Sequence, residues 1–180
     1  MAVLEQKNPE NFVFIDEAGA NTIMASEYAR AEGGKRIKSP RPGCTWEQFS
    51  IIGAISIFGI IAITYGKWAT DSLLFLGFVK NFLLKKLRRG QIVFIDNAKF
   101  HKDKKVRELI ETAGAKLVYL PPYSPDLSPI EKMWSKIKHF LKKLMPRSIA
   151  EFHSALISAI NELNDEDFEE WYECCGYSLR

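Results

Sequence analysis

The tetrapeptide Val-Phe-Ile-Asp occurs twice in this chain of 180 residues, at Val13–Asp16 and again at Val93–Asp96. Each copy is a short apolar run that ends on an aspartate, and a run of this length predicts a buried strand. If the two strands are parallel neighbours, their carboxyl ends lie about 4.8 Å apart. Both carboxylates then leave the same edge of the sheet, where open α/β sheets bind their ligands. The repeat therefore constrains both the fold and the position of a site.

The other predicted elements alternate between strand and helix along the middle of the chain. Strands are predicted at 11–16, 49–57, 60–65, 91–96 and 116–120, and helices at 71–90, 101–113, 128–144, 149–163 and 167–172. The polar segment 17–47 is rich in Gly and Pro, which predicts a loop with a strand fragment. Alternation favours parallel pairing with right-handed crossovers. We expect a single α/β domain over 1–180, with a mixed sheet and helices on both faces.

The run from Gln48 to Gly66 contains no charged residue in 19 positions, which is close to the length that spans a bilayer. Its many isoleucines are interrupted by glycine, and this pattern favours two adjacent buried strands with a turn near Gly59. The first residues, Met1–Asn11, are polar and lack the apolar core of a secretory signal. We therefore expect no membrane span.

Cysteine and charge patterns narrow the class of protein. The cysteines, Cys44, Cys174 and Cys175, match neither a zinc pattern nor a secreted disulfide framework, so we expect reduced thiols in a cytoplasmic protein. The net charge is only +3, but basic residues gather in 85–89, 99–107 and 132–147, and acidic residues in 162–173. This asymmetry is compatible with a surface for nucleic-acid phosphates and equally with two solvated faces.

Asp16 and Asp96 are candidate ligands of a divalent cation. Two carboxylates this close repel each other, and one stays protonated unless a charge compensates. Magnesium binds a few carboxylates together with waters and substrate phosphates. Two such ions about 3.5–4 Å apart stabilise the attacking and the leaving oxygen of a phosphoryl transfer. The alternative is that each aspartate only caps a loop, which the repetition disfavours.

Glu131 is the third candidate acid, and its local sequence leaves two interpretations open. Ser128 at the N-cap and Glu131 three residues later form the pattern of a capping box at the start of a helix. Alternatively, Glu131 lies beside a buried stripe and points over the edge of the sheet. The predicted stripe consists of Ile130, Met133, Trp134, Ile137, Leu141 and Leu144, and its flank carries Ser135, Lys138 and Lys142.

Three blocks of sequence resemble the DDE transposases of the mariner superfamily, most closely the bacterial insertion-sequence type. The first is Phe14-Ile15-Asp16-Glu17 followed by Gly19, and the second is Asp96-Asn97 followed by His101. The third and most specific is Leu-Pro-Pro-Tyr-Ser-Pro-Asp-Leu-Ser-Pro-Ile-Glu, which ends at Glu131. Between Asp96 and Glu131 there are 34 residues. Trp134 and Lys138 also stand where the family usually carries an aromatic residue and a lysine.

The resemblance implies an RNase H-like fold with Asp16, Asp96 and Glu131 as catalytic residues that bind Mg²⁺ or Mn²⁺, as two ions. It implies hydrolysis of DNA at transposon ends, followed by attack of the freed 3′-hydroxyl on target DNA. Asn97 and His101 are candidates for supporting the catalytic acids. Glu17 should point to the other side of its strand from Asp16, so it is left out of the metal-binding set. Predicted DNA contacts are Ser135, Lys138, Lys142 and Lys99; Trp46 and Trp68 are expected in the core.

One departure from the family bears on partners. Its members usually carry an N-terminal helix-turn-helix region that recognises the transposon ends, and we expect none within 1–180 because the first catalytic block begins so early. This implies the second reading frame of a split element, a truncated copy or a cloned fragment. A separately encoded helix-turn-helix subunit and a homodimer on nucleoid DNA are the expected partners. The alternative function is that of an inactive remnant that only binds DNA or a partner.

Overall fold

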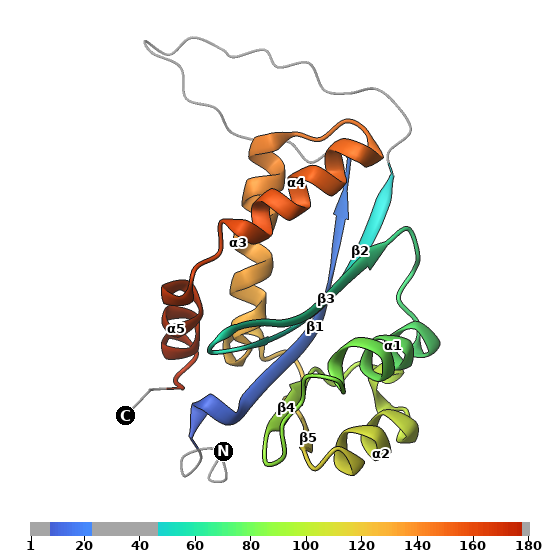
Figure 1. The fold of residues 1–180 in the computed structure, drawn as a ribbon, viewed down its shortest axis with the longest axis vertical. Helices are drawn as coiled ribbons and strands as arrows, with labels where there is room; N and C mark the ends of the chain where they lie inside the picture. The colour runs from blue at the N-terminus through green and yellow to red at the C-terminus, as the bar shows by residue number, and fades with distance from the viewer. Residues whose placement is uncertain (1–7, 23–46, 178–180) are drawn as a thin grey trace.

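A mixed sheet of five strands forms the centre of the molecule (Figure 1). The computed structural model describes residues 8–22 and 47–177, without the side chains of residues 99 and 100. The strands are β1 (Phe12–Asn21), β2 (Gln48–Ser56), β3 (Gly59–Gly66), β4 (Ile92–Ile95) and β5 (Lys116–Tyr119), in the spatial order β3-β2-β1-β4-β5. β1, β4 and β5 are parallel, whereas β2 and β3 run antiparallel to their neighbours. The expected mixed sheet is confirmed.

The two copies of the tetrapeptide pair in register. Val13 lies opposite Val93, Phe14 opposite Phe94, and Ile15 opposite Ile95. The prediction of parallel neighbours is therefore correct.

The prediction that β1 ends on Asp16 is wrong. β1 continues to Asn21 by pairing with β2, in which Glu17 lies opposite Ile52 and Asn21 opposite Gln48. The segment 17–21 has few β-forming residues, so pairing with β2 rather than intrinsic preference makes it a strand. The rest of the predicted loop, 23–46, lies outside the described residues, as do Cys44 and Trp46.

The uncharged run from Gln48 to Gly66 forms the predicted hairpin, β2 and β3, with its turn between Ser56 and Gly59. No helix in the described part of the chain is both long and apolar enough to cross a membrane. Trp68, which follows the hairpin, is 37% exposed. The prediction that it lies in the core is therefore wrong. Cys174 and Cys175 are free thiols, as expected.

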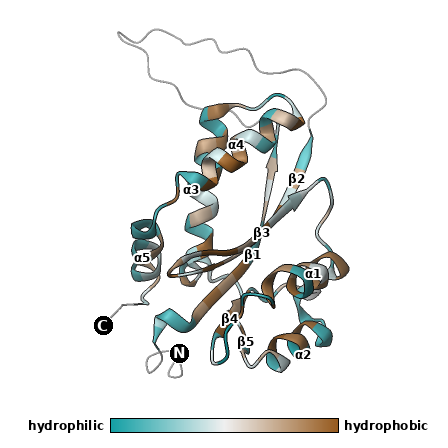
Figure 2. Ribbon diagram, in the orientation of Figure 1, coloured by the Kyte–Doolittle hydropathy of each residue, from teal (hydrophilic) through white to brown (hydrophobic). Residues whose placement is uncertain are grey.

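Helices cover both faces of the sheet, as predicted (Figure 1). Side chains alternate along the strands, so Phe12 and Phe14 pack in one core and Val13 and Ile15 in the other. Figure 2 shows the apolar character of the central strands. The first core lies under α3 (Pro129–Leu144), α4 (Ile149–Asn161) and α5 (Asp165–Cys174), and the second under α1 (Ser72–Phe78), the π-helical turn η3 (Val79–Leu83) and α2 (Lys104–Thr112).

Capping residues set two of the helix boundaries. Asp71 caps α1 as predicted, and its side chain accepts a hydrogen bond from the Leu74 backbone N–H at 2.8 Å. The next helix was predicted to start at His101, but a short 3₁₀ turn, η4 (Lys99–Lys102), comes first. Asp103 then accepts from the Lys105 backbone N–H at 2.9 Å. Because a capping side chain fixes the first turn, α2 starts only after Asp103.

Helix α3 carries the predicted stripe but not the predicted cap. Five of the six stripe residues are at most 2% exposed, whereas Leu144 is 50% exposed because it lies in the last turn. Ser128 occupies the N-cap position, yet its side chain makes no capping hydrogen bond; its carbonyl oxygen accepts from the Glu131 N–H at 3.1 Å. The predicted capping box is therefore wrong, and helix capping does not explain why a glutamate stands at position 131.

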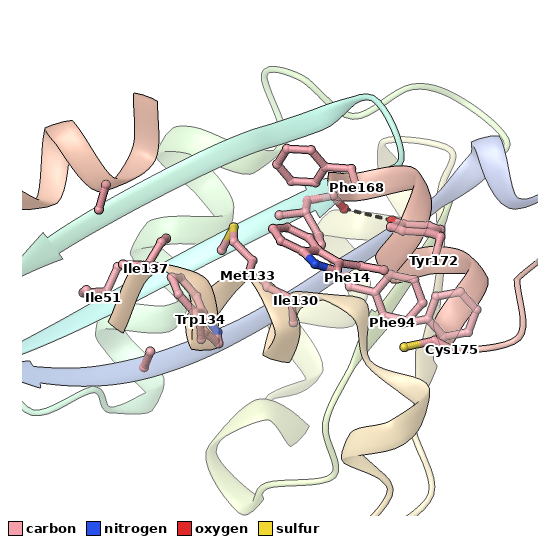
Figure 3. Packing of buried hydrophobic residues seen from close by; sticks show 14 of the residues in the cluster. Phe14, Ile51, Phe94, Ile130, Met133, Trp134, Ile137, Phe168, Tyr172 and Cys175 are labelled. Atoms are coloured by element: carbon pink, nitrogen blue, oxygen red, sulfur yellow. Dashed lines mark hydrogen bonds between the residues drawn. The ribbon is translucent and has the colours of Figure 1, made fainter. Parts of the chain in front are cut away.

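The stripe of α3 packs tightly on the sheet, and Figure 3 shows Trp134 and Met133 against the strands. Gly53 of β2 makes this packing possible: a Cβ at this position would lie 2.7 Å from Cη2 of Trp134. Real Cβ atoms do not approach other atoms so closely, so glycine at position 53 lets the indole ring lie against β2. This close approach brings the edge of Trp134 to Asp16.

Candidate active site

Asp16, Asp96 and Glu131 lie on the walls of one cleft of about 490 Å³. Asp16 and Asp96 follow the last parallel pair of β1 and β4, which is Ile15 opposite Ile95. Glu131 lies in the first turn of α3. Asn97 also lines the cleft, as does the proline-rich segment from Leu120 to Pro125. The structure therefore brings together all three predicted acids and one of the two supporting residues.

Asp16 is largely buried and strongly perturbed. Its Oδ2 accepts a hydrogen bond from Nε1 of Trp134 at 3.1 Å. Burial, followed by the negative charge of Glu131, raises the pKa of Asp16 from 3.8 to about 7. The charges of Glu17 and Asp96 act in the same direction. Near neutral pH this carboxyl group therefore has negative charge around it and little compensation.

Asp96 has the opposite electrostatics. Its Oδ1 accepts hydrogen bonds from the Ala98 backbone N–H at 3.0 Å and from Nδ1 of His101. The hydrogen bond from His101 lowers the pKa of Asp96 below its usual value of 3.8. This side chain is 53% exposed, so it remains accessible from the cleft.

His101 is a fully buried side chain between two carboxylates, and Nε2 donates to Oε1 of Glu17 at 2.9 Å. Burial alone would lower the pKa of His101, but the hydrogen bonds to Asp96 and Glu17 raise it to about 9. The sequence interpretation left Glu17 out, because Glu17 points to the opposite side of β1 from Asp16. The predicted direction of Glu17 is correct, but leaving Glu17 out of the site missed that His101 lies on that side and contacts it. The proximity of Glu17 to Asp16 was the available signal.

The outer rim of the cleft is formed by the proline-rich segment. Tyr123 is fully exposed and has a positive φ of 57°, a backbone conformation that non-glycine residues rarely adopt. The 3₁₀ turn η5 (Pro125–Leu127) follows. Tyr177, which comes after α5, donates from its hydroxyl group to the Leu127 carbonyl oxygen at 2.8 Å. The C-terminal part of the chain thus holds the segment that carries Glu131.

The residues predicted to contact DNA lie outside the cleft. Ser135, Lys138 and Lys142 follow Glu131 along α3, and none of them lines the cleft described above. Ser135 and Lys142 are exposed, and Lys138 is partly exposed. A helix rises about 1.5 Å per residue, so these three side chains extend roughly 6 to 16 Å from Glu131. The side chain of Lys99 lies outside the described residues.

The acidic side chains fit a divalent cation in chemistry, although they do not enclose one as they stand. Within residues 8–22 and 47–177, no three Asp, Glu, His or Cys side chains converge closely enough to hold a metal ion. The donor set consists of carboxylate oxygens, which Mg²⁺ and Mn²⁺ prefer. Burial and, after it, the charge of Glu131 raise the pKa of Asp16, and a cation beside this carboxyl group would oppose both effects.

Solved structures of Mos1 transposase share this fold. The chain matches the Mos1 paired-end complex with left transposon end at a TM-score of 0.74 and 18% identity, over 98% of this chain and 57% of that one. It matches the catalytic domain of Mos1 mariner transposase at a TM-score of 0.67 and 18% identity, over 96% and 84% of the two chains. The expected RNase H-like fold is therefore confirmed. The chain spans less than two thirds of the transposase in the paired-end complex.

No curated protein matches this sequence significantly. Residues 11–153, in contrast, match the family described as DDE superfamily endonuclease. This segment includes both aspartate strands, the proline-rich segment and the whole of α3. Since the match extends over most of the chain, the chain belongs to the DDE superfamily endonucleases, which are enzymes of the nuclease type.

Proposed function

We propose that this chain is the catalytic domain of a transposase of the bacterial insertion-sequence type. It hydrolyses DNA strands at transposon ends, and the freed 3′-hydroxyl group then attacks target DNA. The observation that carries the proposal is the placement of Asp16, Asp96 and Glu131 on the walls of one cleft in a DDE endonuclease. The titles of similar structures describe Mos1 complexes with transposon ends and with Mg or Mn, which supports the same activity and cofactor.

Asp16, Asp96 and Glu131 would hold the metal ions, which we propose are two Mg²⁺ or Mn²⁺ ions. Bound there, such ions supply charge stabilisation for the attacking and leaving oxygens of phosphoryl transfer. The high pKa of Asp16 supports this assignment, because a cation is the natural partner of a buried carboxyl group among acidic neighbours. Glu131 is exposed and makes no capping hydrogen bond, so it is available to approach the two aspartates.

The protein side chains around the acids have separate tasks. Trp134 holds Asp16 through the hydrogen bond to Oδ2 and excludes water on the side of α3. His101 holds Asp96 from the opposite face of the sheet. Asn97 lines the cleft beside Asp96 and is placed to contact the phosphate backbone or to steady the loop. These contacts fix the two aspartates before substrate binds, as catalysis by positioning requires.

DNA would extend from the cleft along α3, where Ser135, Lys138 and Lys142 follow Glu131, with Lys99 as a further contact. We also propose that residues 1–180 act as one catalytic domain with a helix-turn-helix subunit that recognises the transposon ends, and that two copies assemble on DNA. This places the enzyme on chromosomal DNA in the cytoplasm. Each lysine that neutralises a phosphate contributes about one unit to the salt dependence of binding.

The test combines metal binding with DNA cleavage. Mn²⁺ is titrated into the wild type and Asp96→Ala by calorimetry, and both proteins are then incubated with supercoiled plasmid and Mn²⁺. We expect the wild type to bind Mn²⁺ and nick the plasmid, and Asp96→Ala to lose both. Plasmid binding without nicking by the wild type would favour the alternative, a remnant that only binds DNA. As a matched probe of the DNA surface, Lys142→Ala should lower the slope of log affinity against log salt by about one.

A further inference from the structure

A buried histidine links two acidic side chains that come from distant parts of the chain. His101 is 0% exposed, which is unusual for a histidine, and both of its ring nitrogens face carboxylate oxygens. One carboxylate belongs to Asp96, at the cleft, and the other to Glu17, which is only 14% exposed. Carboxylates accept hydrogen bonds and do not donate them when ionised, so both ring nitrogens are the donors.

The position of the His101 ring is fixed by its surroundings. The ring of Phe75, on α1, lies 4.5 Å from the imidazole centroid to centroid. The hydroxyl group of Tyr119 donates to the His101 carbonyl oxygen at 3.2 Å, and the His101 N–H donates to the carbonyl oxygen of Ala98 at 3.2 Å. Ring and backbone are therefore both held, so the ring can act as a rigid support for the side chains that it contacts.

This support acts on one oxygen of Asp96. In the described part of the chain, the two hydrogen bonds that Asp96 accepts, from Ala98 N–H and His101 Nδ1, both end on Oδ1. A carboxylate oxygen has two lone pairs, so Oδ1 is committed to the protein. Oδ2 is left for a ligand in the cleft that Asp96 lines.

Glu17 reaches His101 because of the alternation of β1. Successive side chains of a strand point to opposite faces, so Asp16 faces Trp134 of α3 while Glu17 faces the side of α1 and α2, where His101 lies. The consecutive residues Asp16 and Glu17 thus serve the same cleft from two faces of the sheet. Asp16 lines the cleft, and Glu17 acts on it only through His101.

We propose that Glu17 and His101 are positioning residues that restrict Asp96 to a single metal-binding oxygen, Oδ2. Glu17 orients the imidazole ring, and the ring occupies Oδ1, so Oδ2 would be the oxygen through which Asp96 holds a metal ion. Groups that orient metal ligands in this way commonly change metal affinity about 10- to 100-fold when they are removed. The inference rests on the proposed function, because it requires that Asp96 binds a metal ion.

Two amide substitutions at position 101 separate the two contacts. In His101→Asn the amide nitrogen takes the place of Nδ1, which preserves the contact with Asp96 and removes the one with Glu17. In His101→Gln it takes the place of Nε2, which preserves the contact with Glu17 and removes the one with Asp96. Both variants bury a polar amide at the same position, so they share the cost to folding, which thermal unfolding in EDTA measures.

The experiment is Mn²⁺ binding to the full chain, followed by the loss of the free-ion signal in electron paramagnetic resonance. We expect His101→Gln to bind Mn²⁺ about 10-fold or more weakly than the wild type, and His101→Asn to recover most of that loss. Glu17→Leu should weaken binding less than His101→Gln, because it loosens the ring without freeing Oδ1. Glu17→Gln keeps an acceptor for Nε2 and is expected to resemble the wild type.

Asp96→Ala separates failure of the inference from failure of the proposed function. If Asp96→Ala binds Mn²⁺ as the wild type does, Asp96 is not a ligand and the proposed metal site is wrong. If Asp96→Ala loses binding but His101→Gln binds as tightly as the wild type, the metal site stands and the positioning role of His101 is overturned. Equal weakening in His101→Asn and His101→Gln, with equal loss of thermal stability, would also overturn it, since it shows only a structural role.

Discussion

The two aspartates of the site share the same four-residue sequence and yet have opposite properties. Both follow Val-Phe-Ile, and their strands lie side by side in register. Asp16 is largely buried with a pKa of about 7, whereas Asp96 is half exposed with a pKa below its usual value. The local sequence therefore places both carboxylates, but it does not set their charge.

The difference comes from what surrounds each strand. β1 is central and continues past Asp16 along β2, so α3 covers Asp16 with Trp134 and brings Glu131 close to it. β4 ends before Asp96, and the chain turns back through η4 to place His101 against it. One aspartate is thus held by a neutral donor among acidic groups, and the other by a cationic ring. A bound metal ion would therefore lower the pKa of Asp16 more than that of Asp96.

The largest expected effect is one that the two aspartates share. Asp16→Asn and Asp96→Asn should each lower the rate of Mn²⁺-dependent plasmid nicking by about 10³-fold or more, because each removes a charge that holds the metal ion. Rates are measured under single-turnover conditions with matched protein concentrations. A variant that nicks at nearly the rate of the wild type would remove that aspartate from the catalytic set, while the fold of both variants is checked by circular dichroism.

The same two substitutions should change stability in opposite directions in EDTA. The folded-state pKa of Asp16 lies above its unfolded value of 3.8, so the unfolded chain loses this proton first, and stability falls as pH rises from about 4 to about 7. At pH 8, Asp16→Asn should therefore be more stable than the wild type, by up to about 4 kcal/mol at 1.36 kcal/mol per pKa unit. Asp96→Asn should be less stable, because the ionised form of Asp96 is the one that His101 stabilises.

Urea unfolding between pH 5 and pH 8 provides the measurement. The stabilisation of Asp16→Asn relative to the wild type should grow over this range. The destabilisation of Asp96→Asn should instead be largest at pH 5 and shrink as pH rises, because without Asp96 the pKa of His101 falls and His101 loses its proton at a lower pH than in the wild type. If both variants were destabilised equally at all pH values, the contrast between the two environments would be wrong. Carbon-13 NMR of the aspartate carboxyl groups gives an independent check, with Asp16 titrating near pH 7.

Sequence patterns predicted the strands that carry the two aspartates, but not the difference between the environments of the two side chains. Short apolar runs were enough to predict two buried strands, and their repetition suggested parallel neighbours; the structure adds that the two copies pair in register. The hairpin from Gln48 to Gly66 was likewise predicted from β-branched residues and glycine. These features depend on local sequence and on period, which a single chain displays directly.

Two of the errors concern contacts between residues that are far apart in sequence, and a third concerns the start of α3. The extension of β1 to Asn21 needs β2 as its partner, and the contact of Glu17 with His101 joins positions 84 residues apart. The capping box was expected from Ser128 and Glu131 alone, but the approach of the chain to α3 uses the Ser128 carbonyl oxygen instead. Tertiary contacts decided the first two cases, and no local pattern reports them.

Metal binding should reduce the difference between the two aspartates. A cation beside Asp16 favours its ionised form, so saturating Mg²⁺ should bring the pKa of Asp16 from about 7 towards or below 3.8. The pKa of Asp96 already lies below its usual value without the ion. The ion should also stabilise the fold, by about 2.7 kcal/mol at a concentration of 100 times Kd. NMR titration with and without Mg²⁺ measures the pKa, and urea unfolding with and without Mg²⁺ measures the stability. Ca²⁺, which prefers more ligands and longer distances, serves as the comparison ion. An Asp16 pKa that stays near 7 in Mg²⁺ would place the metal ion away from this residue.

The smallest effect should act on Asp16 alone. In Gly53→Ala the new methyl group would lie 2.7 Å from Cη2 of Trp134, so the indole ring must shift. Overpacking of this kind costs about 1–3 kcal/mol, and a shifted Trp134 weakens its hydrogen bond to Asp16, which removes a donor from the ionised carboxylate. The pKa of Asp16 should therefore rise above its wild-type value, whereas that of Asp96 should not change, because its partners Ala98 and His101 lie away from Trp134.

Gly19→Ala is the matched control, since position 19 lies on the exposed part of β1 and an added Cβ meets no atom within 4 Å. It should leave stability and both pKa values close to those of the wild type, as expected for a surface substitution without a clash. Movement of both aspartate pKa values in Gly53→Ala would mean that the sheet edge responds as one unit. Movement of Asp16 alone would show that α3 tunes one aspartate of an identical pair through a single close contact with β2.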